Sequence, residues 1–146
     1  MKKSLIIAIV LSAFVGVGGS AANRRSQAGP HQAEFQAFYA DFLKAVRAND
    51  KEKIADLISF PVDDWSTDIR HNVQTIKIKD RAEFLKKYDI LFTSSMRLHA
   101  AKAKPEPLKD GRYVMIWKET DVECSFEIGY IDGTGYRLTS YSIGPL

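Results

Sequence analysis

Cysteine is almost absent from this chain, which has a single one, Cys124, among 146 residues. One cysteine cannot form a disulfide within the chain, so the fold must be held together by its hydrophobic core. Apolar residues around it alternate along the chain as one face of a strand would: Val122, Cys124, Phe126, Ile128 and Tyr130. We therefore expect Cys124 to be a small buried hydrophobe. The alternatives are a reactive thiol and a disulfide that links two copies of the chain.

Motifs of catalysis and cofactor binding are also missing. The sequence contains no G-x-S-x-G, no glycine loop that cradles phosphates and no dinucleotide fingerprint. Its three histidines, His31, His71 and His99, are far apart and lack the H-x-x-x-H and H-x-E spacings, so we expect neither a metal nor a cofactor. The stretch from Asp132 to Gly135 resembles an acid-protease triplet, but a single copy between two strands is typical of a turn.

Only one long apolar run is present, from Leu5 to Val17, and its thirteen residues fall short of the roughly 20 that span a bilayer. Two lysines precede this run and small residues follow it as far as Ala22. This order predicts a secretory signal peptide over residues 1–22, cleaved after Ala22 or Ala21. An uncleaved membrane anchor is the alternative. We expect an exported protein, periplasmic or secreted, with no stable membrane insertion after cleavage.

A surplus of one charge is absent as well. The chain has 21 basic and 18 acidic residues, and loss of the two lysines of the signal peptide leaves 19 against 18, a net charge of +1. This balance gives no reason to expect nucleic acid or an anionic membrane as a partner. Residues 23–30 are polar and are expected to be a flexible lead-in. The 45% hydrophobic content suits one globular domain over residues 31–146.

The region from Ala33 to Pro61 predicts two helices. Its first apolar residues recur at helical spacing: Phe35, Phe38, Tyr39, Phe42, Leu43 and Val46. This stripe predicts a helix over about 31–48. Asn49-Asp50 interrupts the pattern, and a shorter helix capped by Asp50 is expected to end before Pro61.

The rest of the chain predicts strands and one further helix. That helix begins at Asp80, which is followed by Glu83 in a variant of the capping box, and ends at Thr93. Residues 63–71 and 105–111 have the composition of loops. Strands are expected in five places: 73–78, 96–103, 112–119, 122–132 and 136–143. Helices followed by an antiparallel meander indicate an α+β fold, with the N-terminal helices packed on a curved antiparallel sheet.

This order of elements resembles the nuclear transport factor two-like superfamily, a cone-shaped α+β barrel that is also called cystatin-like. The resemblance spans about residues 34–143. The residues that carry it are Phe38, Phe42, Ala45, Asn49-Asp50, Ile54, Leu57, Phe60-Pro61, Phe84-Leu85, Tyr88, Trp117 and Tyr130. It implies a pocket between helices and sheet, which members use as enzymes like ketosteroid isomerase or polyketide cyclases, as ligand-binding proteins, or as interaction and dimerisation modules. Exported bacterial members are mostly small single domains without an assigned activity, so the fold does not decide the function.

Two sets of site residues follow from these possibilities. An isomerase-like enzyme needs a carboxylate base and a hydrogen-bond donor for the enolate oxygen. Asp64 with Tyr88 or Tyr130 is the pairing that the sequence offers, although no aspartate aligns with the base of those enzymes and Asp63-Asp64 is typical of a solvated turn. A ligand-binding protein could instead stack a flat molecule on four aromatic residues: Trp65, Tyr113, Trp117 and Tyr130. Each of these taken singly is more typical of a core residue with its polar tip bonded, although a pocket needs only some of them.

The absence of a recognisable catalytic constellation favours a non-catalytic binding module. We expect its pocket to hold a small apolar or aromatic molecule, or its surface to pair with another protein. An isomerase- or cyclase-like enzyme is the alternative, and a homodimer through the outer face of the sheet is a third. An open cavity with an inward carboxylate beside a tyrosine would favour the enzyme. A cavity filled by Trp117 and phenylalanines would argue against it.

Overall fold

The computed structural model describes residues 31–69 and 72–146, and within these ranges the chain has an α+β fold. The predicted signal peptide and lead-in, residues 1–30, lie outside the described residues. The helices are α1 (Gln32–Ala48), α2 (Lys51–Asp56), α3 (Arg81–Lys86), α4 (Tyr88–Leu91) and α5 (Ser94–Ala100). The strands are β1 (Val62–Ile69), β2 (Asn72–Ile78), β3 (Pro105–Pro107), β4 (Tyr113–Glu119), β5 (Val122–Ile131) and β6 (Gly135–Pro145). None of the helices described here combines the length and apolar character that crossing a membrane requires.

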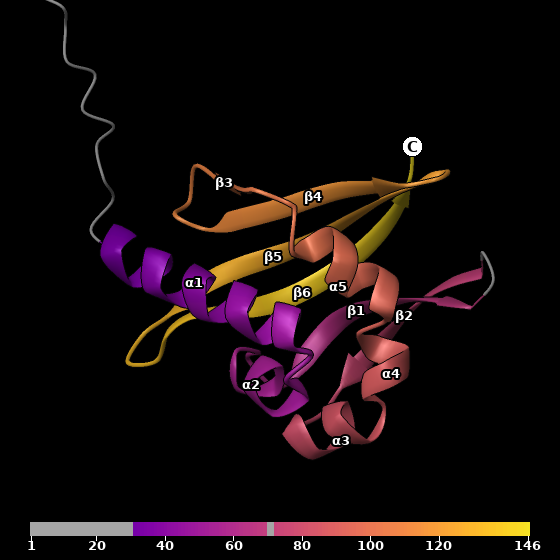
Figure 1. The fold of residues 1–146 in the computed structure, drawn as a ribbon, viewed down its shortest axis with the longest axis horizontal. Helices are drawn as coiled ribbons and strands as arrows, with labels where there is room; N and C mark the ends of the chain where they lie inside the picture. Colours follow the sequence, from indigo (N-terminus) through magenta and orange to yellow (C-terminus); the bar gives the residue numbers. More distant parts are fainter. Residues whose placement is uncertain (1–30, 70–71) are drawn as a thin grey trace, which may run out of the picture.

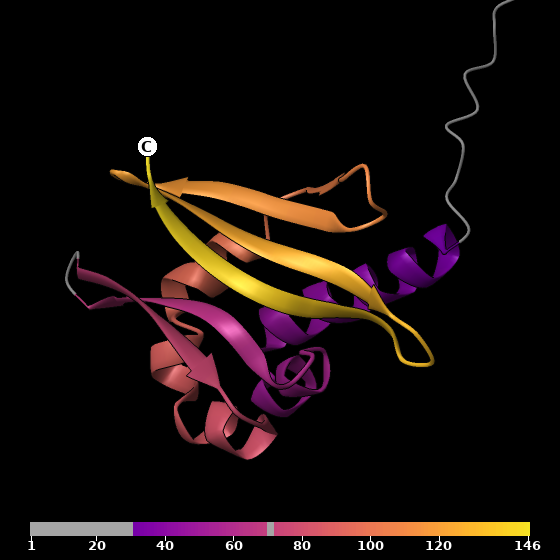
Figure 2. The same ribbon diagram turned by 180° about the vertical axis from the view of Figure 1, so that it is seen from behind.

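Helices and sheet form two layers. Figure 1 shows α1 lying across one face of the sheet, with the other helices on the same side. The view from behind in Figure 2 shows the opposite face of the sheet, which no described element covers. We call this opposite face the outer face.

The sheet has six strands in the order β2-β1-β6-β5-β4-β3. It is mixed, not antiparallel as predicted, because β1 runs parallel to β6, with Trp65 opposite Tyr141. This pairing joins segments that are far apart in the sequence, so no local pattern could reveal it. Among the described strands β2 and β3 are the two edges, and the sheet is open, without the closure of a cone-shaped barrel.

The first two helices lie where the sequence predicts them. Asn49 ends α1 in the left-handed conformation, with φ of 52°, and its N–H donates to the carbonyls of Ala45 and Val46. Asp50 then caps α2, because its carboxylate accepts a hydrogen bond of 3.1 Å from the N–H of Lys53. Two short polar residues thus turn the chain between the helices.

The third predicted helix is in fact three short ones. Asp80 caps α3 as expected, accepting from the N–H of Glu83 at 2.9 Å. The helix stops at Lys86, α4 follows, and Thr93 caps α5 by accepting from the N–H of Met96 at 3.3 Å. The strand predicted over 96–103 was therefore wrong. Met96 and Ala100 are buried at helical spacing while Leu98 between them is 57% exposed, so the apparent alternation was one helix face seen in part.

The loop predicted over 63–71 was also wrong, because β1 occupies most of it. An irregularity between Val62 and Trp65 in the pairing with β2 shifts the side-chain alternation there, which hides the strand pattern. Of the predicted loop at 105–111, the first part forms the short edge strand β3. The three C-terminal strands and β2 agree with the prediction.

Large side chains fill the space between the helices and the middle of the sheet. Phe42 of α1 meets Phe126 of β5 edge to face, with ring centroids 6.1 Å apart, and Phe126 also contacts Trp65 and Trp117. The largest fully buried side chains are Trp65, Phe35, Phe42, Phe84, Phe92 and Phe126. Cys124 is buried among them, as predicted.

Candidate functional site

The predicted carboxylate and its predicted donors lie apart. Asp64 is exposed on the outer face of the sheet, in a polar groove of about 440 Å³ that it shares with Ser66, Thr75 and Glu127. Tyr88 is buried on the helix side, where its hydroxyl donates to the side-chain oxygen of Asn49 at 2.9 Å. Tyr130 lines a different groove, to which Asp64 does not belong. The structure therefore does not bring Asp64 to either tyrosine.

The two tryptophans proposed as ligand contacts are core residues. Trp65 has no exposed surface, and its indole N–H donates to the carbonyl of Leu91 at 2.9 Å. Trp117 is also buried, and its N–H donates to the carboxylate of Glu119 at 2.9 Å. Both have the bonded polar tip that a buried tryptophan needs.

Tyr113 and Tyr130, in contrast, meet at one groove, where they are joined by aromatic residues that the sequence did not single out. This aromatic groove has a volume of about 1,010 Å³ and lies between the start of α1, the turn before β4, the end of β5 and the start of β6. Its aromatic lining consists of His31, Phe35, Tyr113, Tyr130 and Tyr136. These five residues lie together at one end of the helix–sheet interface.

The rings of the aromatic groove form one continuous wall. Phe35 stacks on Tyr113, with centroids 3.4 Å apart and an interplanar angle of 5°. Tyr136 meets both of them edge to face, at 5.2 Å from Phe35 and 5.7 Å from Tyr113. Tyr130 meets Tyr136 edge to face at 5.3 Å, and His31 stacks on Tyr130 at 3.9 Å. Phe35 is fully buried, whereas Tyr113, Tyr130 and His31 are half-buried and present accessible ring surface.

Burial and the Glu34 carboxylate raise the pKa of two phenols at the groove, those of Tyr130 and Tyr136. Desolvation raises the pKa of Tyr130, and the nearby Glu34 carboxylate raises it further. Burial likewise raises the pKa of Tyr136, with added contributions from Tyr113 and Glu34. Glu34 itself is held by the imidazole Nδ1 of His31 at 2.9 Å. At neutral pH Tyr130 and Tyr136 therefore offer uncharged ring faces and phenolic O–H donors.

One sequence signal could have found part of this wall. His31 and Phe35 are four residues apart, so they share a helix face with Tyr39 one turn further on. The spacing does not show that this end of the stripe borders open space while its middle is buried. Tyr136 follows a glycine turn, and nothing in its local pattern marks it as a groove residue.

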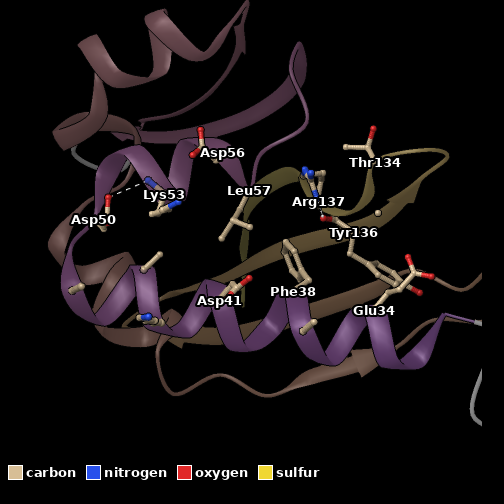
Figure 3. A pocket seen from close by; sticks show the side chains of 15 residues that line it. Glu34, Phe38, Asp41, Asp50, Lys53, Asp56, Leu57, Thr134, Tyr136 and Arg137 are labelled. Carbon is tan, nitrogen blue, oxygen red and sulfur yellow. Dashed lines mark hydrogen bonds between the residues drawn. The ribbon is translucent and has the colours of Figure 1, made fainter.

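A second groove lies beside the first, between α1, α2 and the turn that joins β5 to β6. Figure 3 shows this charged groove, which has a volume of about 750 Å³. Phe38 and Leu57 provide apolar surface, and Figure 3 shows Arg137 beside Leu57 across from α1. Three cationic and four acidic side chains surround it: Lys44, Lys53, Arg137, Glu34, Asp41, Asp50 and Asp56.

Across the described part of the chain, no three histidine, cysteine or carboxylate side chains are grouped so that they could hold a metal ion. Comparison with known proteins adds no assignment. No family model matches the chain, and a search of curated proteins finds no match.

Proposed function

We propose that this protein is an exported, non-catalytic binding module that holds a small, flat, uncharged molecule in the aromatic groove. The observation that carries the proposal is the wall of stacked and edge-on rings from His31 through Tyr130 and Tyr136 to Tyr113. Small-molecule sites are typically concave, lined by aromatic side chains, and equipped with a few polar groups that orient the ligand. The groove combines all three features.

The groove also has the energetics that such binding needs. Half-buried tyrosines offer a large apolar face and lose little conformational entropy, and aromatic pairs contribute about 0.5–1.5 kcal/mol beyond the area they bury. The phenols of Tyr130 and Tyr136 are neutral at ordinary pH, so a flat ligand meets uncharged rings at these two residues. An isomerase- or cyclase-like enzyme has less support, because Asp64 and Tyr88 lie on opposite faces of the sheet.

Family and export are part of the same proposal. Membership of the nuclear transport factor two-like superfamily is supported by the order of elements, with capped helices followed by strands that pack on them. As a member of this superfamily, the protein would have a sheet that curves toward a cone-shaped barrel. Export is supported by the signal-peptide pattern of residues 1–22.

The proposal is tested by titrating the ¹⁵N-labelled protein, residues 23–146, with 2-naphthamide, a flat and neutral probe. We expect the largest amide shifts at the start of α1, at residues 107–113, at the end of β5 and at the start of β6. Tyr130→Ala removes an accessible ring and should weaken binding about fivefold, which corresponds to about 1 kcal/mol of ring contact.

Leu98→Ala is the matched control, because it also truncates an accessible apolar side chain but lies on α5, outside the groove. Its affinity for 2-naphthamide should equal that of the wild type. Shifts that map elsewhere, or equal affinity in the Tyr130→Ala variant, would contradict the proposal.

A further inference from the structure

We propose that the free edge of β2 pairs with β2 of a second copy of this chain, so that two sheets continue into one across a two-fold axis. β2 is a terminal strand of the sheet, at one of its margins (Figures 1 and 2). Among the described elements it pairs only with β1. Alternate residues of an antiparallel strand turn their N–H and C=O groups to opposite sides, so part of its backbone points away from β1. Such unpaired groups are a template for another strand.

The two edges of the sheet differ in how they are protected. β3, at the opposite edge, is only three residues long, Pro105–Pro107, and its two prolines have no N–H to donate. A short edge strand with prolines resists pairing. β2 has seven residues, Asn72–Ile78, and none of them is proline. Of the two described edges only β2 can complete a ladder, so a second copy offers β2 itself as the partner and the interface is isologous.

The one charge on β2 does not guard its edge. Lysine on an edge strand commonly keeps other strands away, because pairing would bring its charge into the new interface. Lys77 is the only charged residue of β2. Its Nζ lies 2.6 Å from Oδ1 of Asp63 on the neighbouring strand β1. The lysine is therefore drawn over its own sheet and leaves the edge open.

Space for a second strand is present along the first half of β2. The four residues Asn72, Val73, Gln74 and Thr75 are all exposed, although successive side chains of a strand point to opposite faces. Val73 is one of the few large apolar side chains that remain exposed, at 39%. Neither the helix layer nor any other described element covers this part of the strand.

A two-fold axis at Thr75 gives the register that uses the whole strand. Thr75 is the central residue of the seven, so the axis sets Asn72 opposite Ile78 and Val73 opposite Lys77 of the other copy. Thr75 meets its own copy, and threonine pairs are favourable neighbours across strands. The two lysines are four residues apart along the strands, about 13 Å. No like charges oppose each other, so β2 is complementary to itself.

The test is sedimentation velocity of residues 23–146 from about 10 μM to about 1 mM. A single pair of strands buries little area, so we expect a weak dimer that forms within this range. Thr75→Lys and Thr75→Glu each place like charges at the axis and should lower the association constant about tenfold. An equal mixture of the two variants should dimerise again, because lysine then faces glutamate. Thr75 is exposed, and unchanged melting temperatures would show that both variants keep the fold.

Ser142→Lys is the matched control. Ser142 is exposed and lies with Thr75 along the polar groove of the outer face, but it belongs to β6. This variant should dimerise like the wild type, whereas pairing through the outer face would be lost. All these proteins should bind 2-naphthamide equally, because β2 does not line the aromatic groove. A monomeric wild type at about 1 mM, loss of the dimer in Ser142→Lys, or a mixture that stays monomeric would overturn the inference.

Discussion

Individual tyrosines link the stability of this protein to alkaline pH. Burial raises the pKa of Tyr39, Tyr88 and Tyr136, although Arg47 and Arg97 partly oppose this for the first two. A phenol whose pKa is higher in the folded state stabilises the fold fully below its unfolded pKa of about 10. That stabilisation is lost as the pH rises through the folded pKa.

We therefore expect the melting temperature to fall above about pH 10 in parallel with phenol ionisation, which absorbance at 295 nm follows. Tyr88→Phe should lower the melting temperature at neutral pH, because it removes the hydrogen bond to Asn49, and should make the alkaline fall shallower. A melting temperature that falls equally steeply in both proteins would contradict this assignment.

The sequence could predict that aromatic residues line a groove, but it could not show which of the rings are accessible. Tyr113 and Tyr130 lie at a groove, whereas Trp65 and Trp117 lie in the core. All four sit in strands, so the type of element does not separate them. Accessibility depends on where α1 begins relative to the strand ends, which is a property of packing.

At the scale of elements, capping residues were the most reliable signals. Asp50 and Asp80 both accept the predicted backbone hydrogen bonds. The alternation of apolar and polar residues was less reliable. It suggested a strand where α5 forms, and it missed β1, because the register shift in that strand breaks the two-residue period. A helix cap depends on hydrogen bonds between residues at most four positions apart. Whether a short apolar segment forms a helix or a strand depends instead on the elements that it packs against.

The cap of α3 gives a direct prediction. Asp80→Ala removes the acceptor of the Glu83 N–H, and we expect a loss of about 1 kcal/mol in the free energy of unfolding, measured with urea. Asp80→Asn keeps a side-chain oxygen and should lose only a few tenths of that amount. If alanine and asparagine had the same effect, the cap would not contribute as described.

For the whole molecule, the sequence predicted the α+β class and the order of most elements. It did not predict the parallel pairing of β1 with β6, which places Asp64 on the outer face and fills the middle of the helix–sheet interface with Trp65. That pairing moves the accessible aromatic surface to the end of the interface. The position of the aromatic groove therefore follows from the order of strands in the sheet, which short-range sequence patterns do not contain.

The central claim is that the aromatic groove carries a small molecule, and native mass spectrometry of the protein purified from the cells that produce it naturally tests it most directly. We predict a mass above that of the polypeptide, released by organic solvent and identified as a flat, neutral, largely apolar compound. The Tyr130→Ala variant, prepared in the same way, should retain less of it. The bare polypeptide mass in every wild-type preparation, or equal retention by wild type and variant, would contradict the account.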